Sequence, residues 1–178
     1  MSDIAKIAQT KLLKDFGSKR NPMSLPRLQK VVINYRCSQS KDNQQQLDAA
    51  QKEIADITGQ KPRLCRAKKS VSSFKLRAGE PLAYKATLRG HKMYDFVEKL
   101  FNIVLPRLRD FQGLSEDSFD SQGNYNFVIK DQTYFPEADL DNITQIRSVQ
   151  ITLNIRSASK SESKMLLSAL GFAFTKNK

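Results

Sequence analysis

Residues 61–92 most constrain what this chain can fold into, because they combine concentrated positive charge with the alternation of a strand. Ten of these residues are Lys or Arg and one, Glu80, is acidic, so the stretch carries nine of the twelve net positive charges of the 178-residue chain. The other 146 residues carry only three. Charge concentrated in this way predicts a surface that faces a polyanion.

The last part of this stretch, residues 82–90, alternates between apolar and polar side chains. The two alternating sets are Leu82, Tyr84, Ala86 and Leu88 on one side and Ala83, Lys85, Thr87 and Arg89 on the other. Such a strand buries its first face and exposes its second, which is basic and carries a hydroxyl. An ordinary solvated sheet face and an RNA-binding face both fit this pattern. The basic loop that precedes the strand favours RNA.

Length and composition predict one domain, residues 1–178, with 39% hydrophobic residues to build its core. No apolar run approaches the length of a membrane span, and the N-terminus does not resemble a signal sequence. We therefore expect the protein to work in the compartment where it is made. Cys37 and Cys65 lie 28 residues apart and His91 is the only histidine, so we expect no metal site, disulfide or cofactor.

Hydrophobic periodicity predicts alternating helices and strands along the chain. Helices are expected at 3–16, 47–57, 93–108 and 159–170, and strands at 28–36, 63–66, 82–90, 124–130 and 147–156. Gly17, Gly59 and Gly171 are expected to end helices, and Pro106 to kink or change a last turn. The pattern predicts an α+β fold, a two-layer sandwich whose mostly antiparallel sheet has helices packed on one face and the other face open to RNA.

Motifs of catalysis are absent from the chain. GxSxG, HExxH and GxxxxGK[ST] do not occur, and His91 has no nucleophile beside it in sequence. We therefore expect no enzyme and no catalytic residue. A group of acidic residues leaves three interpretations open, a solvated loop, a Mg²⁺ site or a contact with a basic partner: Asp117, Asp120, Glu137, Asp139 and Asp141.

A family resemblance rests on long blocks in a fixed order: LPRLQKVVIN (25–34), ITGQKPRLCRAKKSVSSFKLRAGEPL (57–82), KATLRGHKMYDFVEKLFNIVLPRLRDFQGLS (85–115), SFDSQGNYNF (118–127) and FPEADLDNI (135–143). These blocks resemble the bacterial-type ribosomal protein L-five, the universal large-subunit protein that binds 5S ribosomal RNA (rRNA) in the central protuberance. The resemblance runs from about residue 25 to residue 174.

The resemblance implies that the open sheet face holds 5S rRNA. The family's contact positions fall on Asn34, Gln60, Thr87 and Arg89. With their neighbours, the candidate 5S rRNA-binding residues are Asn34, Arg36, Gln60, Lys61, Arg63, Lys85, Thr87 and Arg89. These residue types suit the task, because amides and hydroxyls hydrogen-bond sugars and base edges while Arg can fork onto phosphate.

Two further contacts follow from the same resemblance. The basic loop 68–79 is expected to reach the elbow of the peptidyl-site (P-site) tRNA through Lys68, Lys69, Ser70, Phe74, Lys75 and Arg77. Residues 112–121 and 135–142 are expected to face the small subunit and its protein thirteen in an intersubunit bridge, through Asp117, Asp120, Glu137 and Asp139. Large-subunit rRNA and other central-protuberance proteins complete the expected partners, with no membrane.

The chain departs from the family pattern after its first strand. Residues 35–40 read YRCSQS where the family carries a glycine-rich segment, which puts backbone approach to RNA there in doubt and suggests that Arg36 substitutes with a side-chain contact. This drift favours an organellar, mitochondrial ribosome slightly over a bacterial one. A free RNA chaperone and an acid-loop metal enzyme are the alternative functions.

Overall fold

The structure is a computed structural model that describes residues 3–16, 21–37, 43–109, 111–138 and 145–175. The chain divides into two compact units, each discontinuous in sequence. The first unit comprises residues 1–31, 88–127 and 152–178, and the second comprises residues 32–87 and 128–151. That the whole chain is one domain stays a prediction.

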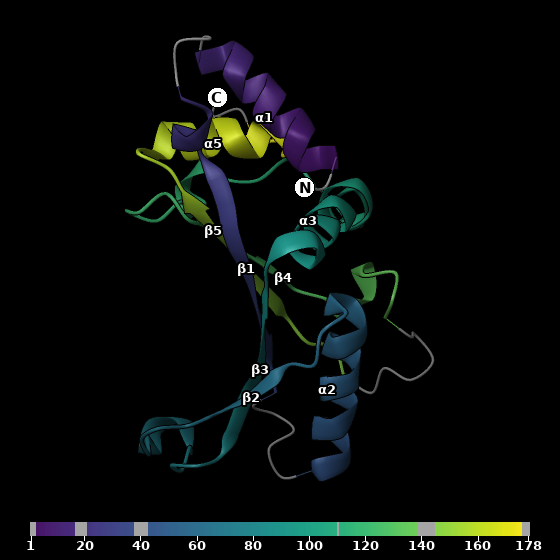
Figure 1. The fold of residues 1–178 in the computed structure, drawn as a ribbon. Coiled ribbons are helices and arrows are strands. Elements are labelled where there is room, and N and C mark those ends of the chain that lie inside the picture. Colours follow the sequence, from purple (N-terminus) through teal and green to yellow (C-terminus); the bar gives the residue numbers. More distant parts are fainter. Residues whose placement is uncertain (1–2, 17–20, 38–42, 110, 139–144, 176–178) are drawn as a thin grey trace. The chain divides into compact units, whose positions relative to one another are not determined.

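The described strands form one antiparallel sheet of five strands in the order β2-β3-β1-β5-β4 (Figure 1). Their bounds are β1 Arg27–Arg36, β2 Arg63–Arg66, β3 Pro81–Leu88, β4 Tyr125–Ile129 and β5 Val149–Arg156. Every strand expected from the sequence is present, with ends shifted by no more than two residues. With the helices that accompany it, the sheet confirms the α+β class.

The two-residue period of the strands separates core from surface. Along β1, Val31, Ile33 and Tyr35 are fully buried, whereas Asn34 between them is half-buried and Arg36 is exposed. Strand β5 repeats the pattern, with four buried apolar residues alternating with polar residues that keep access to solvent. One face of each strand therefore belongs to the core and the other carries polar groups, as the alternation predicts.

Helices follow the predicted apolar stripes. Their bounds are α1 Asp3–Phe16, α2 Gln44–Thr58, α3 Gly90–Lys99, α4 Leu105–Arg107 and α5 Lys160–Ala169. A π-helical turn at Leu100–Val104 joins α3 to α4, whose second residue is Pro106. Proline lacks an N–H group and its ring crowds the preceding turn, so a widened turn there fits the predicted change. Within the described ranges, no helix is long and apolar enough to cross a membrane.

The predicted helix ends are capped by side chains and by glycine. Gly59 follows α2 in the left-handed conformation, at φ 63°. At α5, the Ser159 hydroxyl accepts a hydrogen bond from the Glu162 N–H, which is the first half of the predicted capping box. The return bond differs from the prediction, because the Glu162 carboxylate accepts from the Ala158 N–H, one residue before the N-cap, and not from Ser159 itself. The predicted stop at Gly17 lies outside the described residues.

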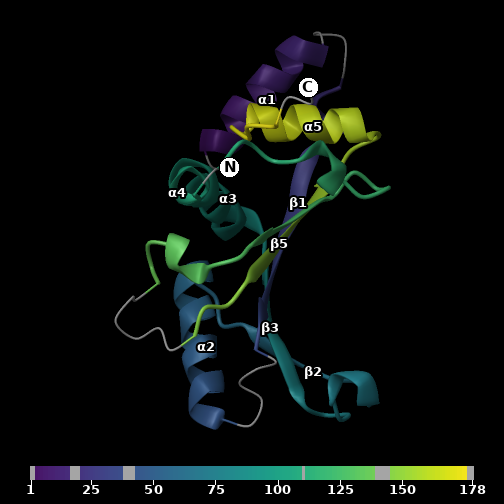
Figure 2. The ribbon, with the colours of Figure 1, turned by 180° about the vertical axis from the view of Figure 1, so that it is seen from behind.

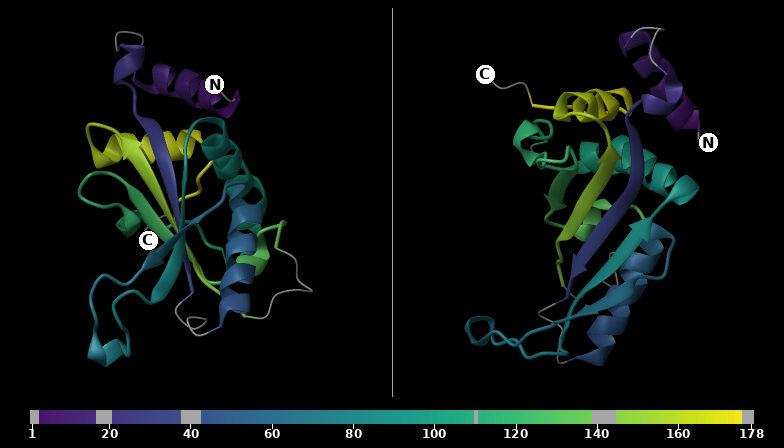
Figure 3. Two further views of the ribbon diagram at one scale, coloured as in Figure 1. Left: turned by 60° about the horizontal axis from the view of Figure 1, so that its bottom comes forward. Right: turned by 60° about the vertical axis from the view of Figure 1, so that its left-hand side comes forward.

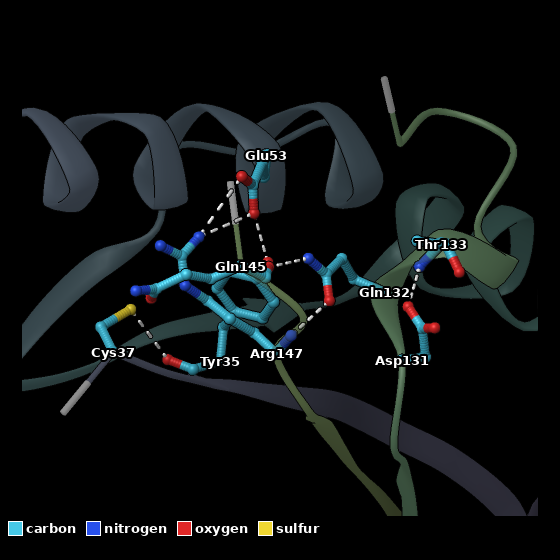
Figure 4. A network of polar contacts seen from close by, with 8 residues as sticks. All are labelled: Tyr35, Cys37, Glu53, Asp131, Gln132, Thr133, Gln145 and Arg147. Carbon is cyan, nitrogen blue, oxygen red and sulfur yellow. Dashed lines mark hydrogen bonds and ion pairs between the residues drawn. The ribbon is translucent and has the colours of Figure 1, made fainter. Parts of the chain in front are cut away.

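A buried polar network holds the second unit together (Figure 4). The Arg147 guanidinium, 4% exposed, donates to both Glu53 carboxylate oxygens at 3.1 and 3.3 Å. The Tyr35 hydroxyl donates to the same carboxylate, and Gln132 accepts from the Arg147 N–H while donating to the Gln145 carbonyl at 2.7 Å. The network joins α2, β1 and the segments on either side of residues 139–144.

Removing the Arg147 charge tests how much this network contributes to stability. We expect Arg147→Met to lower the free energy of unfolding by about 3–5 kcal/mol, because it leaves the buried Glu53 carboxylate without its cation. Lys164→Met is the control, since Lys164 and Glu116 form a half-exposed ion pair, and it should cost less than about 1 kcal/mol. Urea unfolding measures both.

A double variant separates the unpaired charge from lost packing. Glu53→Gln combined with Arg147→Met leaves no buried charge alone, so it should recover part of the stability that Arg147→Met loses. Equal costs for Arg147→Met and Lys164→Met would contradict the stabilising role of the network.

Candidate RNA-binding face

Two basic side chains lie directly opposite each other where β2 pairs with β3. Arg63 is the cross-strand partner of Lys85, and both are exposed. Side chains of directly paired residues emerge on the same face of a sheet, so the two cations are neighbours. Like charges in this position destabilise the free sheet, and a bound anion removes the repulsion. The pairing therefore places two candidate RNA-binding residues side by side.

Three of the predicted polar contact residues lie on or beside this face. Thr87 follows Lys85 by two positions on β3 and is half-buried, between the buried Ala86 and Leu88. The Gln60 amide nitrogen donates to the Thr87 carbonyl at 3.3 Å, which holds the Gln60 side chain at the end of β3. Asn34 lies on β1, the neighbour of β3 in the sheet. The second unit thus brings these groups together.

The remaining candidates lie at the ends of elements. Arg36 ends β1, and Lys61 lies two residues after Gly59, the glycine that ends α2; both are exposed. Arg89 is exposed and immediately precedes α3, in the first unit. It is separated from Thr87 by one residue of chain. The structure thus gives all eight candidates solvent access, and their role in binding 5S rRNA stays a prediction.

The basic loop 68–79 connects β2 to β3 (Figure 3). Hydrogen bonds close the loop at its base. The Ala67 N–H donates to the Glu80 carbonyl and the Gly79 N–H to the Ala67 carbonyl, both at 2.9 Å. The Arg66 guanidinium reaches across the base to the Gly79 carbonyl at 3.0 Å. The Ser70 hydroxyl accepts from the Ala78 N–H at 3.0 Å. The predicted Ser70 therefore shapes the loop from within.

The tip of the loop presents an aromatic ring and a cation. Val71 and Leu76 exchange two backbone hydrogen bonds at 2.9 and 3.1 Å, and a 3-10 turn, Ser72–Phe74, lies between them. Phe74 is 80% exposed, and Lys75 has a left-handed backbone at φ 49°. The flanking predicted cations Lys68, Lys69 and Arg77 are all exposed. The loop can offer both stacking and charge to a ligand.

The acidic residues predicted for the intersubunit contact differ in their exposure and in the hydrogen bonds that their carboxylates accept. Asp120 accepts from the Gln122 and Asn124 N–H groups and from the Asn124 side-chain amide, at 2.7–2.9 Å. Slight burial raises the pKa of Asp120, but these hydrogen bonds outweigh it and lower the pKa overall. Asp117 and Glu137 are exposed, in different units. Asp139 lies outside the described residues.

The two cysteines have opposite environments. Cys37 is 1% exposed, its thiol donates to the Tyr35 carbonyl at 3.5 Å, and burial raises the pKa of the thiol to about 11. Cys65 lies on β2 and is half-buried. Both thiols are free. Among the described residues, no group of three or more His, Cys, Asp or Glu side chains could hold a metal ion.

Thiol alkylation tests this placement. We expect iodoacetamide at pH 8 to modify Cys65 and spare Cys37, because a buried thiol with a raised pKa is neither accessible nor ionised. Cys65→Ser should make the folded protein almost unreactive, and urea should restore one modifiable thiol. Mass spectrometry of tryptic peptides identifies the site. Modification of Cys37 in the folded protein at the rate of Cys65 would contradict the buried position.

Sequence reasoning missed the buried network of Arg147, Glu53 and Gln132. Arg147 was expected to begin a strand, but β5 begins at Val149 and Arg147 lies buried before it. Its partner Glu53 is 94 residues away, and no local pattern signals a pair at that separation. Gln132, which is fully buried, falls between the expected strands 124–130 and 147–156, where the sequence predicts no helix or strand.

Comparison with known protein families assigns the chain. A family model described as ribosomal protein L5 matches residues 21–77, and a second, for the C-terminus of the same ribosomal family, matches residues 81–174. The chain belongs to the ribosomal protein L5 family. This makes it a structural component of the large ribosomal subunit, with a part in translation, and not an enzyme.

Relatives of this family resemble the chain over nearly its whole length. The large ribosomal subunit protein uL5 of Caldanaerobacter subterraneus subsp. tengcongensis is 47% identical over 165 residues, covering 93% of this chain and 92% of the relative. The protein of the same name from Ruminiclostridium cellulolyticum is 48% identical over 155 residues, covering 87% and 86%. These relatives are bacterial, so they do not support the preference for a mitochondrial ribosome.

Proposed function

We propose that this member of the L5 family binds 5S rRNA in the central protuberance through the exposed face of β2 and β3 and the adjoining end of β1. The observation that carries the proposal is the cross-strand pair Arg63 and Lys85, two exposed cations held side by side. Membership of a ribosomal family supplies the polyanion, since ribosomal RNA surrounds such a protein. Asn34, Gln60 and Thr87 add hydrogen-bonding groups beside this charge, and Arg36, Lys61 and Arg89 extend it.

The Lys85→Gln variant tests this proposal through two opposite effects. It should raise the free energy of unfolding of the free protein by about 0.2–1 kcal/mol, because it removes a like-charge contact. It should weaken binding to 5S rRNA. The slope of log K against log salt, which is negative, should become less steep by ~0.7, the value for one lost phosphate contact. For about six phosphates, the slope of the unmodified protein is expected near −4.

A matched variant keeps this experiment specific. Lys52→Gln removes one exposed lysine from α2, so it should change neither the slope nor the stability beyond about 0.5 kcal/mol. Filter binding over a salt series and urea unfolding provide the two readouts. If Lys85→Gln binds 5S rRNA with the affinity and slope of the unmodified protein, the assignment of the face is wrong.

We propose further that the loop 68–79 contacts P-site tRNA. The exposed Phe74 ring can stack on a nucleotide, while Lys68, Lys69, Lys75 and Arg77 approach phosphates. The hydrogen bonds at the loop base and those between Val71 and Leu76 support this role, because they constrain the backbone that carries Phe74 and Lys75.

Truncating the tip aromatic tests the tRNA contact separately from 5S rRNA binding. Phe74→Ser should weaken P-site tRNA binding to ribosomes that carry the variant by about 1–3 kcal/mol, the usual contribution of one stacked base. Binding of the isolated variant to 5S rRNA should not change. Unchanged tRNA binding would remove Phe74 from the proposed contact, and weaker 5S rRNA binding would assign the loop to that RNA.

The acidic residues have two different roles in the proposed intersubunit contact with small-subunit protein thirteen. We propose that the exposed carboxylates of Asp117 and Glu137 face the partner, and that Asp120 shapes the loop through its own hydrogen bonds. Asp139 is retained in the proposal from its sequence position alone. The bacterial relatives support a bacterial ribosome as the setting, with large-subunit rRNA and other central-protuberance proteins as neighbours.

A further inference from the structure

The two ends of the chain form a second concentration of basic residues that the proposed function does not use. Residues 1–31 contain seven basic and two acidic residues, and residues 152–178 contain five and one. Outside these ends and the stretch 61–92, the chain is net acidic, with eight basic and fourteen acidic residues. The chain ends therefore carry as much net positive charge as the basic stretch itself.

The fold of the first unit brings helices from the two ends together (Figures 1 and 2). Helices α1 and α5 pack against each other, and a groove of about 380 Å³ lies between them. Lys11 and Lys14 line it from α1 and Lys164 lines it from α5, while Met165 and Ala169 provide apolar surface. Asp15 is the acidic residue in the lining, so the lysines leave the groove positively charged.

Lys164 is held in position by contacts outside the groove lining. Its ammonium group lies 2.5 Å from a carboxylate oxygen of Glu116 and 5.9 Å from the centre of the Phe174 ring. Its side chain nevertheless remains 42% exposed. The Glu116 carboxylate therefore already balances the Lys164 charge, which leaves Lys11 and Lys14 as the cations of the groove that can face a ligand.

Lys11 and Lys14 are exposed neighbours on α1. They lie three residues apart, so their Cβ atoms are about 5–6 Å apart on one helix face and their like charges oppose helix formation. In the described part of the chain neither forms an ion pair with an acidic side chain. The dipole of α1 favours Lys14, in its last turn, but not Lys11 one turn earlier. Asp15, four residues after Lys11, supplies one negative charge against these two positive charges, so an external anion can balance the charge that remains.

We propose that the α1–α5 groove binds a segment of ribosomal RNA backbone, with phosphates against Lys11 and Lys14 and a ribose or base face against Met165 and Ala169. The spacing of the two lysines suits adjacent phosphates of one strand, and the apolar floor suits the less polar face of a nucleotide. The inference rests on the proposed function in one respect, that the protein binds ribosomal RNA. It adds a second contact, on the first unit, separate from the face of β2 and β3.

The test compares Lys11→Gln/Lys14→Gln with the charge-conserving Lys11→Arg/Lys14→Arg. The RNA probes are bacterial 5S rRNA alone, and 5S rRNA together with bacterial large-subunit rRNA. With the RNA that fills the groove, the Gln variant should lose two phosphate contacts. Its slope of log K against log salt should therefore be less negative by ~1.4, at ~0.7 for each phosphate, and its binding at 0.1 M salt should be ~25-fold weaker. The Arg variant should retain the slope. Circular dichroism and thermal unfolding confirm that both variants are folded.

The two arms separate the possible sources of the backbone. A loss with 5S rRNA alone assigns the groove to 5S rRNA, and a loss only in the presence of large-subunit rRNA assigns it to the larger molecule. Unchanged slopes in both arms, with normal binding by the unmodified protein, overturn the inference. If the unmodified protein binds neither RNA, the proposed function fails and the inference fails with it.

Discussion

The alternation of side chains along the strands is the constraint on which the structure depends. Because successive residues of a strand point to opposite faces, Val31, Ile33 and Tyr35 cannot enter the core without sending Asn34 and Arg36 to the other side. The same rule on β3 buries Tyr84 and Ala86 and displays Lys85 and Thr87. Core formation and the display of polar groups are thus one event, and a shift of register by one residue would destroy both.

The paired cations Arg63 and Lys85 on β2 and β3 lower the stability of the free protein slightly. The buried network of Arg147, Glu53 and Tyr35 contributes more to stability than this repulsion costs. Repulsion between exposed charges is weak because water screens it, whereas an ion pair shielded from solvent and shared with a tyrosine hydroxyl is costly to break. Burial is the main cause that raises the pKa of that hydroxyl, followed by its contact with Glu53. The second unit therefore keeps its strongest polar contacts away from solvent. Its repelling pair, Arg63 and Lys85, lies on the surface, where a bound anion can reduce the repulsion.

The sequence predicts elements well here and long-range contacts poorly. Periodicity locates the helices and strands, Gly59 marks the end of α2, and Ser159 with Glu162 marks the start of α5, because each signal lies within a few residues of chain. It does not reveal that Arg147 is buried against Glu53, since that contact depends on tertiary packing. Nor does it show that Asp120 uses its carboxylate within its own turn, because carboxylates in a polar loop look alike in sequence.

The left-handed backbone of Lys75 gives the tip of the basic loop a conformational cost. In the described chain the other residues with positive φ are all glycines, for which this conformation is nearly free of strain. A side chain with a Cβ atom pays about 1 kcal/mol or more to adopt it. Glycine would make the isolated protein more stable at this position, but it would remove the ammonium group beside the aromatic ring. The turn thus keeps a conformational penalty in the unbound state, and lysine would offset that penalty here only through a contact that its ammonium group makes.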